Sequence, residues 1–88
     1  MNNTTVYKSV TDGHNTWQII KKNGVYHWRG SKRRCWNCPK VAFDYKEVAE
    51  LYSRYMFMKH GIQQRTYWDD CCEVWHLTTS HTKIWVWT

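Results

Sequence analysis

The dipeptide Asn23-Gly24 constrains the fold more than any other feature of the sequence, because it predicts a tight β-hairpin turn. Such turns need positive φ angles, which asparagine and glycine adopt at little cost. The flanking segments 17–21 and 25–29 place apolar and aromatic residues at alternate positions, as strands with one buried face do. The weakly alternating segment 5–10, closed by the turn signal Asp12-Gly13, is a third expected strand.

Residues 44–59 have the pattern of an amphipathic helix. Asp44 followed by Glu47 is a capping-box pattern, and Phe43 and Val48 have the spacing of a hydrophobic staple. Apolar residues then recur at helical spacing along one stripe, and a glycine soon after the stripe is a natural C-terminal stop. The sequence therefore predicts a helix over this range.

The last part of the chain predicts a second hairpin. Segments 72–78 and 82–87 are rich in β-branched and aromatic residues, and 79–81 is a loop of common hairpin length. Eighty-eight residues leave room for one core, so residues 1–88 are expected to form a single domain. The predicted class is α+β: an antiparallel β-sheet of two hairpins with one central helix packed on one face.

The spacing of Cys35 and Cys38 can supply two ligands of a tetrahedral zinc ion. A structural site needs two more ligands. The candidates are Cys71, Cys72, His60, His76 and His81. We expect zinc, if bound, to be held by the first pair together with one vicinal cysteine and one histidine.

We take Cys35, Cys38, Cys72 and His76 as the candidate set. If residues 72–78 form one strand, Cys72 and His76 share a face but lie about 13 Å apart, too far for one metal. The four are therefore not all expected to bind together. Free thiols packed in a small core remain the alternative, and the sequence requires no other cofactor.

Positive charge is concentrated in the first half of the chain. Residues 1–40 hold eight Lys or Arg and one acidic residue, which is a net charge of +7. Residues 41–88 hold five Lys or Arg and six acidic residues, a net charge of −1, so the whole chain has a net charge of +6. This asymmetry favours an anionic partner on one side. The expected contact residues are Arg29, Lys32, Arg33, Arg34, Trp36 and Lys40. A solvated basic loop that only keeps a Trp-rich chain dissolved has the same composition.

Two classes of partner fit this surface. Lysine and arginine neutralise phosphates, and an exposed tryptophan can stack on an unpaired base, so nucleic acid is one class. Trp, Tyr and Arg also dominate protein–protein interfaces, for which Trp68, Trp85 and Trp87 are further candidates. The sequence contains no Gly-rich phosphate loop, nucleophile elbow or HExxH motif, so we do not expect an enzyme.

In size and composition the chain resembles the small accessory proteins that bacteriophages and mobile elements encode against host machinery. The resemblance implies a non-enzymatic inhibitory protein that binds a host defence or nucleic-acid-handling complex through the basic, Trp-containing surface. The alternative is direct binding of single-stranded DNA or RNA, with or without structural zinc. The sequence shows no signal peptide and no membrane span, so we expect the chain to act in the host bacterial cytoplasm and not at a membrane. We expect it to be a monomer or a homodimer.

Overall fold

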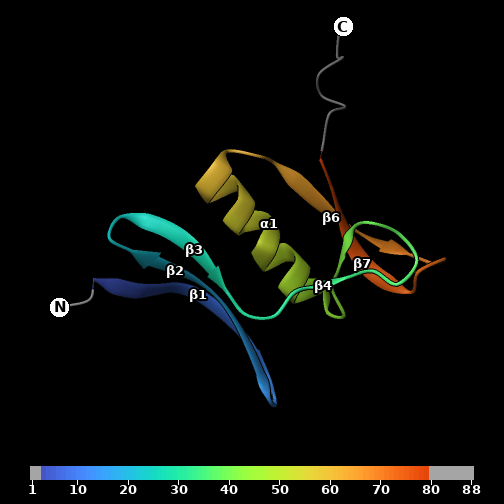
Figure 1. Cartoon of the computed structure of the whole chain (residues 1–88), viewed down its shortest axis with the longest axis horizontal. Coiled ribbons are helices and arrows are strands. Elements are labelled where there is room, and N and C mark those ends of the chain that lie inside the picture. The colour runs from blue at the N-terminus through green and yellow to red at the C-terminus, as the bar shows by residue number, and fades with distance from the viewer. Residues whose placement is uncertain (1–2, 80–88) are drawn as a thin grey trace, which may run out of the picture.

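The computed structural model describes residues 3–79 (Figure 1). Its elements are β1 (Thr4–Asp12), β2 (Asn15–Lys22), β3 (Val25–Arg29), β4 (Arg33–Arg34), β5 (Val41–Ala42), α1 (Lys46–His60), β6 (Gln64–Asp69) and β7 (Val74–Thr79). Over this range one helix packs against antiparallel strands, which confirms the predicted α+β class. The strands form three small sheets instead of one continuous sheet.

The N-terminal sheet has the order β1-β2-β3, with both pairs antiparallel. The turn predicted at Asn23-Gly24 is confirmed, with φ angles of 52° and 82°. Trp17 and Ile19 of β2 are buried in the main core, whereas Lys21 and Lys22 at the end of the strand are exposed. Ile20 is buried as well, although alternation places it on the opposite face from Ile19, so alternation identifies Trp17 and Ile19 but not the whole buried part of β2.

The helix begins two residues later than predicted, and the expected capping box does not form. Its N-cap is Tyr45, which makes no side-chain capping hydrogen bond. The Asp44 carboxylate instead accepts a hydrogen bond from Arg33 at 2.6 Å, so it is not available to cap the helix. The predicted stop is confirmed: Gly61 has a φ of 72°, and its N–H donates to the Phe57 carbonyl.

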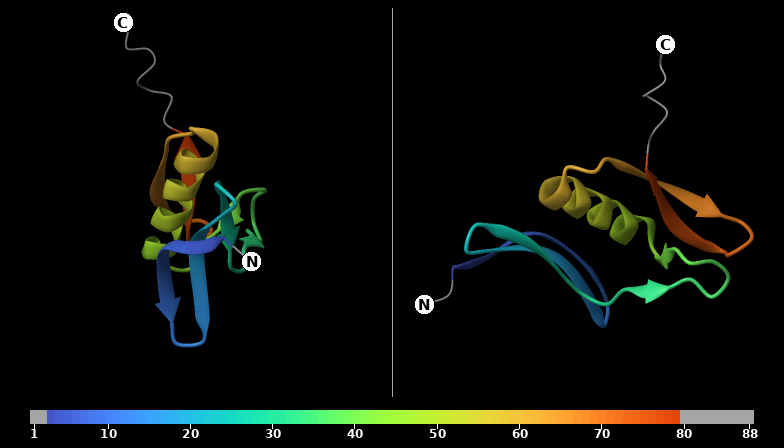
Figure 2. Two further views of the ribbon diagram at one scale, coloured as in Figure 1. Left: turned by 90° about the vertical axis from the view of Figure 1, so that its left-hand side faces the viewer. Right: turned by 45° about the horizontal axis from the view of Figure 1, so that its top comes forward.

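Helix α1 lies between the N-terminal sheet and the β6–β7 hairpin (Figures 1 and 2). The main core fills the space around it. Its buried members are Trp17, Ile19, Phe43, Val48, Ala49, Leu51 and Tyr55. Phe43 and Val48, the pair predicted as a staple, thus pack in one cluster although the N-cap residue differs.

The second hairpin differs from the prediction in the residue at which its strand begins and in the strand with which it pairs. Strand β7 begins at Val74 and pairs with β6, a strand that the sequence analysis did not assign. Residues 70–73 form the turn between them, and Glu73 has a positive φ of 57°. Cys72 therefore lies in a turn and not in a strand. The segment 82–87, the predicted partner strand, lies outside the described residues.

A second, smaller core joins the β4–β5 hairpin to the β6–β7 hairpin. The backbone of Phe43 exchanges two hydrogen bonds with that of Trp75, so the end of β5 lies beside β7. The buried residues of this cluster are Cys35, Ala42, Cys72 and Val74. Loop 35–40 is thereby held against turn 70–73 (Figure 2, right). Within residues 3–79, no helix is long and apolar enough to cross a membrane.

Candidate metal centre

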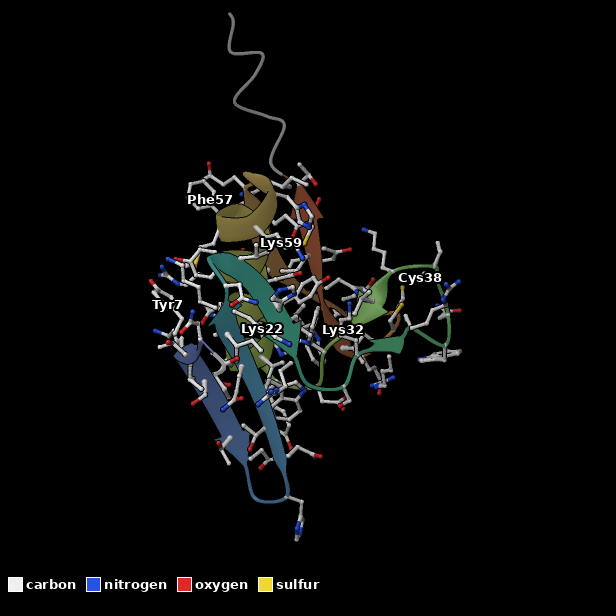
Figure 3. All side chains as sticks on the ribbon, turned by 60° about the vertical axis from the view of Figure 1, so that its left-hand side comes forward. Tyr7, Lys22, Lys32, Cys38, Phe57 and Lys59 are labelled. Atoms are coloured by element: carbon white, nitrogen blue, oxygen red, sulfur yellow. The ribbon has the colours of Figure 1, made fainter. Side chains whose placement is uncertain are left out.

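Four side chains from three segments converge at the second core. Cys35 and Cys38 come from the β4–β5 hairpin, Cys72 from turn 70–73 and His76 from β7. Their sulfur and nitrogen ligand atoms all lie within 4.8 Å of one another. Figure 3 shows Cys38 on this loop, at the opposite side of the view from Tyr7 in β1. The cluster could therefore hold one metal ion between the two hairpins.

The separations of the ligand atoms fit a tetrahedral metal. Zinc–sulfur bonds of about 2.3 Å at tetrahedral angles place two sulfurs about 3.8 Å apart. The Sγ atoms of Cys38 and Cys72 are 4.0 Å apart, and Cys38 Sγ lies 3.4 Å from His76 Nε2. The longest separation needs to shrink by about 1 Å to match that geometry. Side-chain rotation alone can supply such a change.

The orientation of His76 is also that of a metal ligand. The side chain is 0% exposed, and its Nδ1 lies 2.8 Å from the backbone carbonyl oxygen of Val41. In the neutral tautomer that donates this hydrogen bond, the lone pair is on Nε2, which faces the cysteines. Metal-binding histidines are commonly fixed by such a bond from the other ring nitrogen.

Asn37 is the residue that organises the loop around the sulfurs. Its backbone N–H donates to Cys35 Sγ at 3.4 Å, and its side-chain amide donates to Cys72 Sγ at 3.7 Å. The loop is closed by a 2.8 Å hydrogen bond from the Cys35 N–H to the Lys40 carbonyl. N–H groups aimed at sulfur stabilise thiolates, and the thiolate is the form that binds metal.

The cysteines of the metal-free cluster differ in acidity. Burial raises the pKa of Cys35, but hydrogen bonds from the Asn37 N–H and from the Cys72 and Cys38 thiols outweigh it and lower that pKa to about 6. Burial, together with donation to Cys35, raises the pKa of Cys72 to about 12. Cys35 therefore loses its proton more readily than Cys72 does. A metal ion would displace the remaining thiol protons and take their place.

Asp69 shapes the turn that carries Cys72. Its Oδ1 accepts the backbone N–H of Cys71 at 3.0 Å and that of Cys72 at 3.2 Å. The hydrogen bonds from Cys72 and then Cys71 hold the pKa of the Asp69 carboxyl below its usual range, although burial opposes them. The carboxylate thus stays charged, and it keeps residues 70–73 folded back toward the cysteines.

All four residues predicted as ligands are brought together, although one distance argument from the sequence is wrong. The separation of about 13 Å between Cys72 and His76 assumed an extended chain. The turn removes that separation, because Cys72 precedes β7 instead of belonging to it. The alternative Cys71 is exposed and outside the cluster, and His60 lies at the end of α1. His81 lies outside the described residues.

The basic segment, residues 29–40, is exposed apart from its two cysteines, but several of its cations already have partners inside the molecule. Lys32 Nζ lies 3.4 Å from the Tyr52 hydroxyl, Arg33 pairs with Asp44, and Lys40 Nζ lies 2.8 Å from the Tyr67 hydroxyl. No such contact is found within residues 3–79 for the other two cations, Arg29 and Arg34. The sixth expected contact residue, Trp36, is 72% exposed.

The sequence analysis missed Asn37 and Asp69 as supporting residues. A signal for Asp69 was present: aspartate hydrogen-bonds the backbone two residues further on and thereby starts turns. Asp69-Asp70 directly before the vicinal cysteines is such a pattern. Asn37 lies inside the CxxC spacing, but a single asparagine in a loop carries no comparable signal.

Replacing Asn37 with alanine is expected to weaken metal binding about tenfold, the lower end of the range for residues that support metal ligands. The backbone N–H to Cys35 persists, so only the amide that donates to Cys72 is lost. Competition with a chromophoric zinc chelator measures the change in affinity. An unaltered affinity would show that the side-chain amide does not support the bound thiolate.

Comparison of the chain with protein-family models, with curated proteins and with solved structures finds no match.

Proposed function

We propose that this chain is a non-enzymatic binding protein whose contact loop is held in place by one structural zinc ion. The observation that carries the proposal is the convergence of Cys35, Cys38, Cys72 and His76, two of which lie between the exposed residues Arg34 and Lys40. The metal and the contact surface belong to the same loop. Zinc would therefore fix the position of the contact surface.

The donor set favours zinc over other metals and a structural role over a catalytic one. Three thiolates and one imidazole suit zinc, whereas Mg²⁺ and Ca²⁺ prefer oxygen ligands. Four protein ligands complete a tetrahedron and leave no position for water or substrate. Four hollows of about 230 to 400 Å³ on the described part of the chain are not lined by any of the four ligand residues, although the one of about 280 Å³ adjoins them at Pro39, Lys40 and Val41.

The small size of the second core explains why a metal is needed there. Its buried members are two cysteines, one alanine and one valine, which offer little apolar area. Burial contributes about 25 cal/mol per Å² of apolar surface, so these side chains cannot strongly hold two hairpins together. A metal that bridges loop 35–40 and turn 70–73 would supply the missing free energy.

The charge on this part of the surface supports an anionic partner. Among Lys and Arg in residues 3–79, Arg33 is the one within ion-pair distance of a carboxylate. Acidic side chains are more often used internally: Asp12 accepts from Tyr45, Asp44 from Arg33 and Asp69 from the backbone. The positive charge in the first half of the chain therefore faces outward, where it can attract phosphates or carboxylates.

A second candidate function is inhibition of a host protein complex, as phage accessory proteins perform it. Exposed aromatic side chains favour it, because Trp36 and Trp68 are 72% and 47% exposed and tryptophan is enriched in interface hot spots. The acidic turn 70–73 follows Trp68 closely in the sequence, and Trp36 donates a hydrogen bond to Cys72 in that turn. An interface with a protein would use both tryptophans, whereas a polyanion would avoid the turn.

Charge reversal at the two cations without internal partners tests the contact surface. The variant Arg29→Glu/Arg34→Glu is expected to elute from a heparin column at lower salt than wild type. It should also elute earlier than Arg54→Glu/Lys59→Glu, a control on helix α1 with the same change in net charge. Arg33 is left intact, because its ion pair with Asp44 would confound stability with binding.

Equal elution of the two double variants would show that heparin senses net charge alone, and the assigned surface would then be wrong. The zinc content of each variant, measured by elemental analysis, should remain one ion per chain. A chain that carries no zinc would contradict the structural half of the proposal.

A further inference from the structure

Trp36 combines two properties that rarely occur together: its ring is exposed, yet its position is fixed. It is 72% exposed, the largest exposed fraction among the large hydrophobic side chains that are exposed in residues 3–79. Its indole N–H donates to the Cys72 carbonyl oxygen at 3.3 Å. The chain on both sides is held by Cys35 and Cys38 of the metal cluster.

A fixed and exposed indole ring presents a flat apolar face to solvent. Most of the ring is uncovered in the free protein, so a ligand that covers it would bury apolar surface there. The polar edge of the ring is already satisfied by Cys72, and therefore the ring faces are what remains to be used. Flat aromatic ligands, such as nucleic-acid bases, cover such a face best.

Cations lead away from Trp36 along the chain. Arg34 and Arg29 are exposed in the same segment, which spans at most about 25 Å from Arg29 to Trp36. On the other side, turn 70–73 carries the exposed acids Asp70 and Glu73. A polyanion at Trp36 would be repelled by the turn and attracted toward Arg34, which gives it one favoured direction.

We propose that Trp36 is a stacking platform for an unpaired base of single-stranded nucleic acid, whose phosphates run from Trp36 toward Arg34 and Arg29. This inference rests on the proposed function and names the partner class of that surface. Bases within a duplex are stacked on one another and cannot cover the indole. The ligand is therefore a single strand, and DNA and RNA share the required chemistry.

The test uses the zinc-loaded full chain and fluorescence anisotropy of a labelled, mixed-sequence oligonucleotide of about 15 nucleotides. We expect Trp36→Ala to weaken its binding by between about fivefold and about 150-fold, the range for loss of one base–aromatic stack. Trp36→Phe keeps a ring but cannot donate to Cys72, so it should lose less. Zinc content is measured for each variant, to show that the cluster is intact.

Phe57→Ala is the matched control. Phe57 is also an exposed aromatic side chain, with 57% exposure, and it lies on α1 far from Cys38 in Figure 3. Its removal should leave oligonucleotide binding unchanged. The same-sequence duplex and poly-glutamate of matched charge serve as competitors, and both should compete more weakly than the unlabelled single strand.

Wild-type affinity of Trp36→Ala would overturn the inference, and so would equal competition by duplex or poly-glutamate. A zinc-bound chain that passes the heparin test but does not bind the oligonucleotide would overturn this inference alone. Binding of poly-glutamate in that case would assign the surface to an acidic protein partner. Failure of zinc content or of the heparin comparison would instead contradict the proposed function.

Discussion

Chelation of zinc is expected to lower the thermal midpoint of the chain by at least about 12 °C. The reason is that the proposed zinc would join two hairpins whose shared buried apolar cluster is small. Structural zinc contributes apparent free energies of about 10–16 kcal/mol in zinc-finger peptides. Domains of this size have total stabilities of about 5–15 kcal/mol, so loss of even a fraction of the metal's contribution is large.

The size of the shift follows from the unfolding entropy of small domains. In a domain of 60–100 residues, each kcal/mol lost lowers the midpoint by about 4–8 °C. A loss of about 3 kcal/mol, well below the full metal contribution, therefore already gives about 12–24 °C. Circular dichroism melts with and without a chelator such as EDTA, under reducing conditions, measure the change.

The measurement has an internal control, because re-addition of zinc should restore the original midpoint. An unchanged midpoint in chain shown to be free of metal would reduce the cluster to packed thiols. The hydrogen bonds of the Asn37 amide and of Cys38 with Cys72 would then be the contacts that hold the sulfurs together.

The parts of the fold that the sequence predicts correctly depend on local chemistry. The turn at Asn23-Gly24 and the end of α1 at Gly61 both require positive φ, and glycine or asparagine at such positions identifies them. The apolar stripe of the helix is likewise readable, because periodicity reports the buried face. The start of the helix is harder to predict. Aspartate is a residue type that often caps helices, but the carboxylate of Asp44 accepts a hydrogen bond from Arg33 instead.

The second hairpin shows the limit of local patterns. Residues 72 and 73 continue the strand-like pattern of Val74 and Trp75, so alternation alone assigns all four residues to one strand. In the structure the Asp69 carboxylate and the positive φ of Glu73 fold them into a turn. The metal set was therefore identified by donor chemistry, whereas the geometry that makes it possible came from a turn that alternation does not reveal.

The same distinction between local and tertiary features applies to the exposed basic residues. Exposure of Arg29, Arg34 and Trp36 agrees with the expectation from the sequence. The internal contacts of Lys32 and Lys40 with tyrosines far along the chain have no local signal, because they depend on tertiary placement. Only the structure separates cations that are free to meet a partner from those that already have one.

The vicinal cysteines allow a sharper test of the metal centre than any other pair in the chain. Cys72→Ser is expected to abolish stoichiometric zinc binding and to lower the midpoint nearly as much as chelation does. Cys71→Ser should leave both unchanged, within about 0.5 kcal/mol of stability, because Cys71 is exposed and contributes no ligand. The two variants have the same amino-acid composition, and their substituted positions are adjacent in the chain.

The decisive comparison is how each variant responds to the chelator. If Cys72 is a ligand, EDTA should lower the midpoint of Cys71→Ser as it does for wild type and have no further effect on Cys72→Ser, because two changes that act on one interaction are not additive. If the chain binds no metal and Cys72 is a packed thiol, its replacement costs about 1–3 kcal/mol for a buried hydroxyl, and EDTA changes the midpoint of none of the three proteins. Equal chelator effects on both variants would place the metal elsewhere in the chain.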